Sequence, residues 1–230
     1  MTCTAEPNGP IPLFNQLKAR CEKEWEAYCH HEFITGIGDG SLPQECFRHY
    51  LMQDYIFLIH FSRAWALAVY KSENLTDMRA AATTLNAHLN FEMDLHVKYC
   101  AGWGITEEEL EQTVEANANM AYTRYVLERG LAGDILDLNV ALAPCVIGYA
   151  VICKDLIGYP ATKLEGNPYR DWIEMYAGEE YQAIADSAAH HLDILAASRM
   201  GVDRIDSLAK TFKQATTLEI GFWEMGLHLL

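Results

Sequence analysis

Apolar residues recur every three to four positions along most of the chain, the spacing that places them on one face of an α-helix. The first such stretch begins at Leu13 and continues through Leu17, Cys21 and Tyr28. No segment of useful length alternates apolar and polar residues, as a half-buried β-strand would. The pattern predicts helices over residues 13–31, 41–71, 76–102, 106–129, about 142–158, 169–176, 179–199 and 203–230. We therefore expect an all-α bundle.

Proline and glycine residues predict where regular structure is interrupted. The chain has 230 residues with no internal repeat and no linker, so we expect one domain over residues 13–230. A flexible tail over residues 1–12 is predicted because it contains three prolines and a glycine. Three glycines in residues 35–41 predict a connector that breaks the helical pattern. We do not interpret this segment as a phosphate-binding loop, because no strand precedes it and no Gly-Lys-Ser/Thr sequence follows.

Three sites carry recognisable helix-boundary signals. Ser41 is expected to cap a helix that has Pro43 in its first turn. Thr106 and Glu109 have the spacing of a capping box, in which each side chain bonds the backbone N–H of the other residue. Gly130 is expected to end the helix that this box begins.

The segment 142–153 is almost entirely apolar or small and predicts a buried helix centred on Cys145. Tyr149 follows Cys145 by four residues, so the thiol and the phenol share one helix face. Gly148 allows another element or a ligand to approach the backbone closely. This helix could line a small pocket that contains a nucleophile, although the commoner role of such a cysteine is that of a small buried hydrophobic residue.

Two carboxylates interrupt apolar helix faces. Asp54 precedes Phe57 and Phe61 on one face, and Glu219 lies among apolar residues that include Phe222. A buried carboxylate must be paired, hydrated or functional, and a dry pocket would shift its pKa. The structural alternatives are pairing of Asp54 with a partner such as Arg63 or a neighbouring amide, and exposure of Glu219 on the surface of an amphipathic helix. Tyr122, in an apolar stretch, adds a further phenol that could be either a core or a site residue.

Histidines occur in two arrangements that could suggest a metal or haem centre. His88, Glu92 and His96 lie along one helix face, but without the Glu-x-x-His spacing of helical di-metal sites. We favour a hydrogen-bonded polar stripe there. His30 and His31 could provide an axial haem ligand, but capping of a helix C-terminus is the commoner role for such residues.

Composition and charge narrow the function classes. The formal net charge of −15 argues against binding to nucleic acid or to an anionic membrane surface. No apolar run is expected to approach the ~20 residues of a membrane span, and no secretory signal is recognised at the N-terminus. The seven cysteines include no Cys-x-x-Cys pair, which is typical of reduced thiols and favours a cytoplasmic location.

Four segments, in this order and at this spacing, resemble the TenA (thiaminase II) family. They are His31-Glu-Phe-Ile-Thr-Gly-Ile-Gly-Asp-Gly-Ser-Leu-Pro43, Tyr50-Leu-Met-Gln-Asp-Tyr55, Leu142-Ala-Pro-Cys145 and Glu219-Ile-Gly-Phe-Trp223. The resemblance spans residues 13 to 226. It implies an all-α, haem-oxygenase-like fold, a homotetramer, and hydrolysis of aminopyrimidines in thiamin salvage, with cleavage of thiamin itself in some members.

The resemblance also implies roles for individual residues. Cys145 matches the cysteine that adds to the pyrimidine ring, which places the chain in the cysteine-containing branch of the family. Asp54 matches the carboxylate that holds the ring nitrogen and the exocyclic amine, and Glu219 matches the acid that serves the leaving group. No metal or cofactor is implied. The further substrate-binding positions are Phe57, Tyr122, Tyr149, Tyr176 and Phe222.

Two other function classes stay open on the sequence alone. One is a pyrimidine-binding or regulatory protein that does not turn over its ligand. The other is a haem- or metal-dependent oxygenase on the same fold, which would use the histidines described above. The sequence leaves the preferred substrate open among 4-amino-5-aminomethyl-2-methylpyrimidine, its formylated derivative and thiamin.

Overall fold

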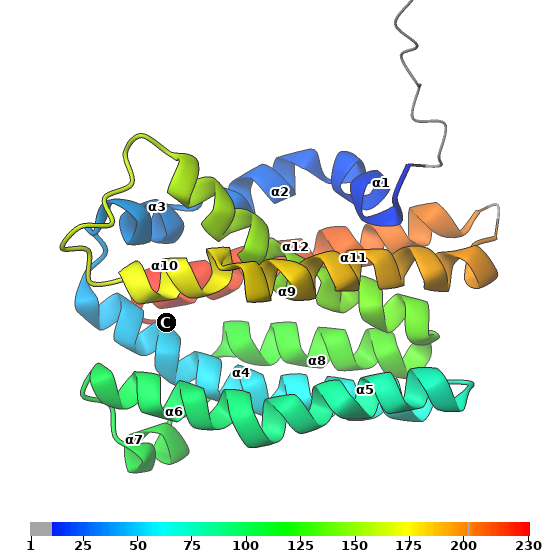
Figure 1. The fold of residues 1–230 in the computed structure, drawn as a ribbon, viewed down its shortest axis with the longest axis horizontal. Coiled ribbons are helices and arrows are strands. Elements are labelled where there is room, and N and C mark those ends of the chain that lie inside the picture. The colour runs from blue at the N-terminus through cyan, green and yellow to red at the C-terminus, as the bar shows by residue number, and fades with distance from the viewer. Residues whose placement is uncertain (1–10, 202) are drawn as a thin grey trace, which may run out of the picture.

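A computed structural model describes residues 11–201 and 203–230, and this part of the chain is helical with no strand (Figure 1). The predicted all-α fold is therefore confirmed. Of the predicted tail, residues 1–10 lie outside the described residues. The helices are α1 (Leu13–Arg20), α2 (Glu22–Cys29), α3 (Glu32–Asp39), α4 (Gln44–Lys71), α5 (Leu75–Ala87), the π-helical turn η1 (His88–Glu92), α6 (Met93–Gly102), α7 (Glu107–Gln112), α8 (Asn117–Ala132), α9 (Ile135–Gly158), α10 (Arg170–Ala177), α11 (Glu179–Arg199) and α12 (Arg204–His228).

Helix α9, which contains Cys145, is the central element of the bundle. It packs against α8, α10, α11 and α12, and most of its side chains are buried. Asp134 and Asp137 form a capping box at its start, and Arg204 from α12 donates to Asp134 Oδ1 at 2.6 Å and to Asp137 Oδ2 at 2.8 Å. The expectation that no apolar run is long enough to span a membrane is wrong, because α9 passes that test by length and composition. Burial against the neighbouring helices explains its apolar composition equally well.

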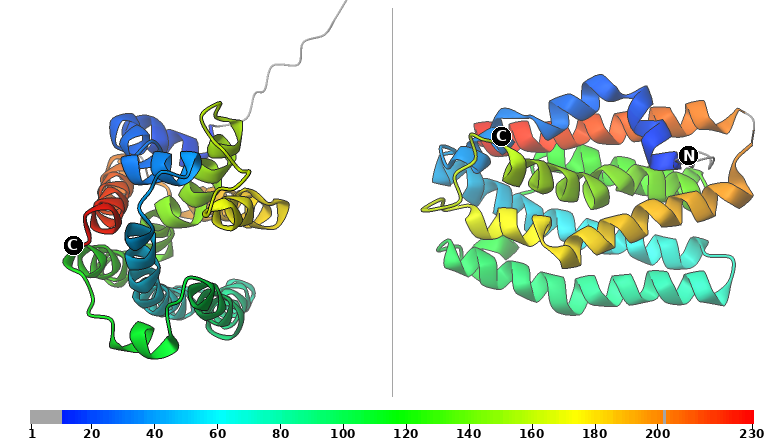
Figure 2. Two further views of the ribbon diagram at one scale, coloured as in Figure 1. Left: turned by 90° about the vertical axis from the view of Figure 1, so that its left-hand side faces the viewer. Right: turned by 45° about the horizontal axis from the view of Figure 1, so that its top comes forward.

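Helices α5, η1 and α6 form an outer layer beside α4, and α1 to α3 cover a different side of the bundle (Figures 1 and 2). The chain reverses direction after α4, so η1 and α6 run antiparallel to it. Asn74 caps α5, with its Oδ1 accepting from the Asp77 N–H at 2.9 Å. One nearly continuous helix over 76–102 is thus confirmed, with a π-helical turn that the apolar spacing did not indicate.

The glycine-rich segment 35–41 is largely helical, which corrects the predicted connector. Helix α3 continues to Asp39 and ends at Gly40, whose φ is +79°. Inside α3, a Cβ on Gly38 would lie 2.8 Å from Leu156 Cδ2, and one on Gly36 would lie 3.1 Å from the Leu42 Cβ. These glycines permit close packing and do not form a turn.

Long-range hydrogen bonds set several helix boundaries that the sequence misplaced. The Thr106–Glu109 capping box is confirmed, but its helix, α7, ends at Gln112 and does not continue to residue 129. The Gln53 side chain donates to the Val114 carbonyl at 2.9 Å and accepts from the Ala116 N–H at 3.0 Å, and so holds the chain extended between α7 and α8.

Four other predicted boundaries also differ. The helix that contains Cys145 begins at Ile135 and not near residue 142. Gly130 lies inside α8, where Leu67 and Leu138 leave no room for a side chain. Helix α4 begins after Pro43 and has no side-chain cap, so Ser41 does not cap it. The predicted helix over 13–31 is divided at Cys21, whose φ of −135° separates α1 from α2.

Candidate active site

Three reactive side chains from distant parts of the sequence lie close together: Asp54 from α4, Cys145 from α9 and Glu219 from α12. The two carboxylates are almost fully buried, with 8% and 1% of their surfaces exposed, whereas Cys145 is partly exposed. Surface exposure, the structural alternative for Glu219, does not apply, because this residue lies in the core.

Burial gives the two carboxyl groups different proton affinities. It raises the pKa of Glu219 to about 8, although the hydrogen bond from Tyr122 opposes the shift and the charge of Asp54 adds to it. The Tyr122 hydroxyl donates to Glu219 Oε1 at 2.7 Å. Burial also raises the pKa of Asp54, to about 6, and there His96 opposes the shift while the Glu92 charge adds to it. At neutral pH Glu219 therefore holds a proton for most of the time, and Asp54 is mostly ionised.

The thiol of Cys145 is neutral in the free protein. Burial raises its pKa well above the ordinary value, and the negative charges of Glu219 and Asp54 raise it further. A thiolate there would need either a cation or a proton acceptor close by. The thiol thus becomes nucleophilic only when a bound group changes the local charge or accepts its proton.

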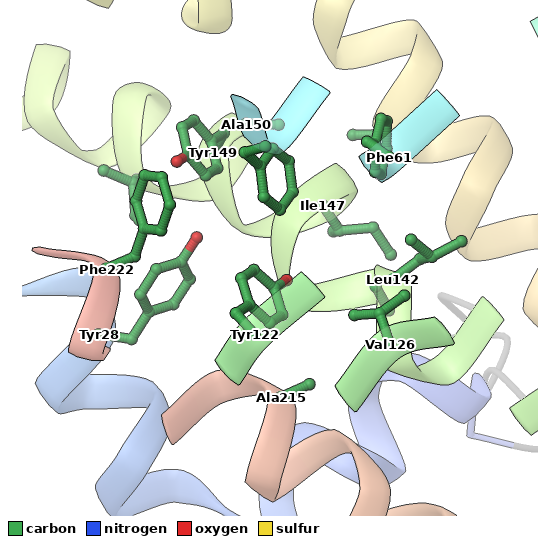
Figure 3. Packing of buried hydrophobic residues seen from close by; sticks show 14 of the residues in the cluster. Tyr28, Phe61, Tyr122, Val126, Leu142, Ile147, Tyr149, Ala150, Ala215 and Phe222 are labelled. Carbon is green, nitrogen blue, oxygen red and sulfur yellow. The ribbon is translucent and has the colours of Figure 1, made fainter. Parts of the chain in front are cut away.

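Aromatic rings surround these groups. Phe57 stacks on Tyr122 with ring centroids 5.5 Å apart, and Phe222 packs edge-on against Phe57 at 5.8 Å. Tyr149 lies 5.0 Å from Tyr176, centroid to centroid. Figure 3 shows Tyr122, Tyr149 and Phe222 gathered in one region although they come from α8, α9 and α12. All eight residues identified from the sequence therefore lie around one site.

The sequence interpretation missed two phenols that complete the site. Tyr28 lies against α9, where its hydroxyl donates to the Pro144 carbonyl at 3.2 Å, and a Cβ on Gly148 would come within 2.6 Å of its ring. Tyr50 is fully buried, and its hydroxyl has no hydrogen-bond partner among the described residues. Asp54 follows Tyr50 by four residues on the same helix face, and this spacing could have identified it.

The histidines are engaged by protein groups. His96 faces Asp54, with Nδ1 3.5 Å from Oδ2, and its Nε2 lies 3.0 Å from the Leu51 carbonyl oxygen. His88, which lies one turn before Glu92 in the sequence, contacts the Glu92 carboxylate through its Nδ1. The hydrogen-bonded polar stripe predicted over His88, Glu92 and His96 is thus confirmed only at His96, because the buried Nδ1 of His88 has no hydrogen-bond partner among the described residues. Within residues 11–201 and 203–230, no three His, Cys, Asp or Glu side chains converge as a metal site.

His30 and His31 differ in their roles. His30 occupies the C-terminal cap position of α2, as expected, and its Nε2 lies 2.6 Å from the Tyr159 hydroxyl oxygen. His31 instead caps the N-terminus of α3 by accepting from the Phe33 N–H at 3.2 Å, which corrects its predicted role. Its second ring nitrogen lies 2.9 Å from Glu224 Oε1.

Comparison with known proteins finds similar chains and similar structures. A curated relative named aminopyrimidine aminohydrolase, from Halalkalibacterium halodurans, is 37% identical and is covered over 94% of its length by 92% of this chain. A crystal structure described as a TenA family transcription regulator, from Silicibacter sp. TM1040, is 49% identical with a TM-score of 0.88, and the match covers 96% of this chain and 98% of that one.

A more distant structure agrees at the level of the fold alone. It comes from Shewanella denitrificans and is described as having a heme oxygenase-like fold. It is 11% identical with a TM-score of 0.73, and the match covers 94% of this chain and 92% of that one. Residues 18–229 match the model of the TENA/THI-4/PQQC family, and the chain belongs to that family.

Proposed function

We propose that the protein is an aminopyrimidine aminohydrolase of thiamin salvage, which converts 4-amino-5-aminomethyl-2-methylpyrimidine and water into the 5-hydroxymethyl pyrimidine and ammonia. The observation that carries the proposal is the convergence of Cys145, Asp54 and Glu219 in a family member with a relative named for this activity. Cleavage of thiamin by the same route is part of the proposal.

The first half of the proposed reaction is addition of the Cys145 sulfur to the ring carbon next to the substituted one. The thiol proton is transferred, in net terms, to the ring nitrogen that Asp54 holds. In the free protein, burial and the nearby negative charges keep the Cys145 thiol neutral. Transfer of its proton to the ring makes the thiol nucleophilic, because the protonated ring compensates the negative charge of Asp54. Phe57 and Phe222 provide apolar surface against which the flat ring can lie.

The second half replaces the amine by water. Electrons of the adduct expel the amine, which takes a proton from Glu219 as the carbon–nitrogen bond breaks, and an exocyclic methylene remains. Water then adds to that methylene and gives a proton back to Glu219, and departure of the sulfur restores the aromatic ring. A carboxyl group with a pKa of about 8 is protonated at neutral pH, as the first of these steps requires.

A non-catalytic regulatory role is the second candidate, because the Silicibacter relative is described as a transcription regulator. The net charge of −15 disfavours direct binding to DNA, whose phosphates attract a basic surface.

We further propose that the protein is a cytoplasmic homotetramer that acts on its small-molecule substrate without a metal or cofactor.

One experiment separates the two candidates. The purified protein is incubated with the aminomethyl pyrimidine, its formylated derivative and thiamin, and formation of the hydroxymethyl pyrimidine is followed by chromatography. We expect multiple turnovers with at least one of the three. Product binding without turnover of any of them would contradict the enzyme and support the regulatory role.

A further inference from the structure

Glu92 is a charged residue that faces the candidate site without having any part in the proposed mechanism. It is the last residue of η1, and π-helical turns within longer helices often occur at functional sites. Its side chain is 45% exposed, so its charge is hydrated and costs little to maintain.

The antiparallel pairing of α4 with η1 and α6 fixes where Glu92 lies. His96, four residues after Glu92, faces Asp54, and His88, four residues before it, packs its ring 4.7 Å from that of Phe61. Phe57 lies between Asp54 and Phe61 on α4, so Glu92 lies opposite Phe57, the residue proposed to contact the pyrimidine ring.

Electrostatic effects agree with this placement. The negative charge of Glu92 raises the pKa values of Asp54, of Cys145 and of Tyr181, which comes from α11. A carboxylate whose charge acts on groups of α4, α9 and α11 lies within the range of charge–charge interaction of all three helices. His88 contacts the Oε2 atom of Glu92 through its Nδ1.

We infer that Glu92 is a specificity-determining residue whose carboxylate binds a positively charged group on carbon 5 of the pyrimidine. This inference rests on the proposed pyrimidine substrate. An aminomethyl group is an ammonium ion in solution at neutral pH, and the thiazolium of thiamin is also cationic. The ammonium ion is the form that binds, and it loses one proton to water before the departing amine takes a proton from Glu219. Glu219, mostly protonated, is poorly suited to attract either, whereas the hydrated carboxylate of Glu92 attracts both.

The test compares two pyrimidines that differ in charge at the same position: the aminomethyl compound, which is cationic, and its N-formyl derivative, which is neutral. Values of kcat and KM are measured for wild type, Glu92→Gln and Asp94→Asn. Asp94 is the matched control, because it is exposed on α6 only two residues away, and its replacement removes the same charge from the chain.

We expect Glu92→Gln to raise KM for the cationic pyrimidine by roughly threefold to tenfold with little change in kcat, the scale of a partly exposed charge pair. The neutral pyrimidine, and both pyrimidines with Asp94→Asn, should change by less than about twofold, because distant exposed charges are screened by salt. Equal changes for the two pyrimidines, or an equal effect of Asp94→Asn, would overturn the inference.

A separate measurement tests the role of Glu92 if the protein is not an aminopyrimidine hydrolase. If wild type turns over neither pyrimidine, the dissociation constants of the same two compounds are measured by calorimetry with the same three proteins. Selective loss of affinity for the cationic compound in Glu92→Gln would support the role of Glu92 in a binding protein. Equal affinities in wild type and Glu92→Gln would overturn it.

Discussion

At the scale of single residues, the site separates two carboxyl groups by their proton affinities. Asp54 has a pKa of about 6, because the charge of His96 opposes the rise that burial causes. Glu219 has a pKa of about 8 and accepts a hydrogen bond from the neutral Tyr122 phenol. Their environments thus suit one carboxyl group to act as an anion and the other as an acid, although both are buried. The neutral thiol between them is suited to attack only after a substrate has bound.

Replacement of Cys145 by alanine tests the nucleophile. We expect Cys145→Ala to lose at least ~99% of turnover, because the covalent route has no other nucleophile at that position. The variant should retain its helical circular dichroism and its affinity for the hydroxymethyl product. Cys153→Ala, which removes a buried thiol two turns along α9, is the control and should remain active. Retention of more than a few per cent of the rate by Cys145→Ala would exclude the covalent mechanism.

The two carboxyl groups predict the pH profile. Asp54 must be ionised and Glu219 protonated, so kcat/KM should fall below about pH 6 and above about pH 8. Because the two groups interact, the measured limits belong to the pair. Glu219→Gln should lose the alkaline limb and lower kcat by roughly two to four orders of magnitude, with product binding retained. A larger loss for the aminomethyl pyrimidine than for thiamin would identify the amine as the group that receives the proton. An unchanged alkaline limb in Glu219→Gln would exclude Glu219 as its origin.

At the scale of elements, α9 positions the thiol by packing closely against α2. A side chain at Gly148 would collide with Tyr28, so Gly148→Ala should lower the free energy of unfolding by about 1–3 kcal/mol and reduce turnover. Gly221, inside α12, has no atom within 4 Å of the position that a Cβ would occupy. As the control, Gly221→Ala should therefore be neutral or stabilising by about 0.5–1 kcal/mol. Chemical denaturation measures both changes, and equal effects would show that the Tyr28 contact does not matter.

Local signals predicted the helices well, and long-range contacts account for most errors. The limits of α11 and the Thr106–Glu109 capping box follow from neighbouring residues, and both were predicted. The break between α7 and α8 depends on Gln53, about 60 residues away, so no local pattern could indicate it. Gly38 in α3 likewise matches the shape of a distant element, α9, through Leu156.

The site residues show the same contrast between local sequence signals and long-range contacts. Residue spacing alone identified Cys145, Asp54 and Glu219 only as possible site residues. The family resemblance then implied a catalytic role for each of them. Glu92 and Tyr50 were not selected, since their relevance depends on how α4 pairs with η1 and on which hydroxyl lacks a partner. Sequence periodicity contains neither kind of information.

At the scale of the whole molecule, the buried acid of the site lowers the stability of the fold. Glu219 has a pKa of about 8 in the folded protein against an ordinary value of 4.5, so the folded state retains a proton that the unfolded state releases between these values. Stability should therefore fall as pH rises through this window. Relative to wild type, Glu219→Gln should gain roughly 2–4 kcal/mol on going from pH 5 to pH 9, as measured by urea unfolding. A constant difference across that range would mean that Glu219 is not protonated in the folded state.

Exposed apolar residues on η1 and α6 suggest where the proposed tetramer assembles. Phe91 on η1 and Leu95 on α6 are separated by one helical turn and are 62% and 63% exposed, a pairing that favours burial against another chain. Light scattering at micromolar concentration should give four times the chain mass of 26.0 kDa. Leu95→Lys should lower that mass, because it places a charge on the apolar surface, whereas Lys98→Glu, at an exposed polar position on the same helix, should not. A monomer mass for wild type would contradict the tetramer, and an unchanged tetramer in Leu95→Lys would place the interface elsewhere.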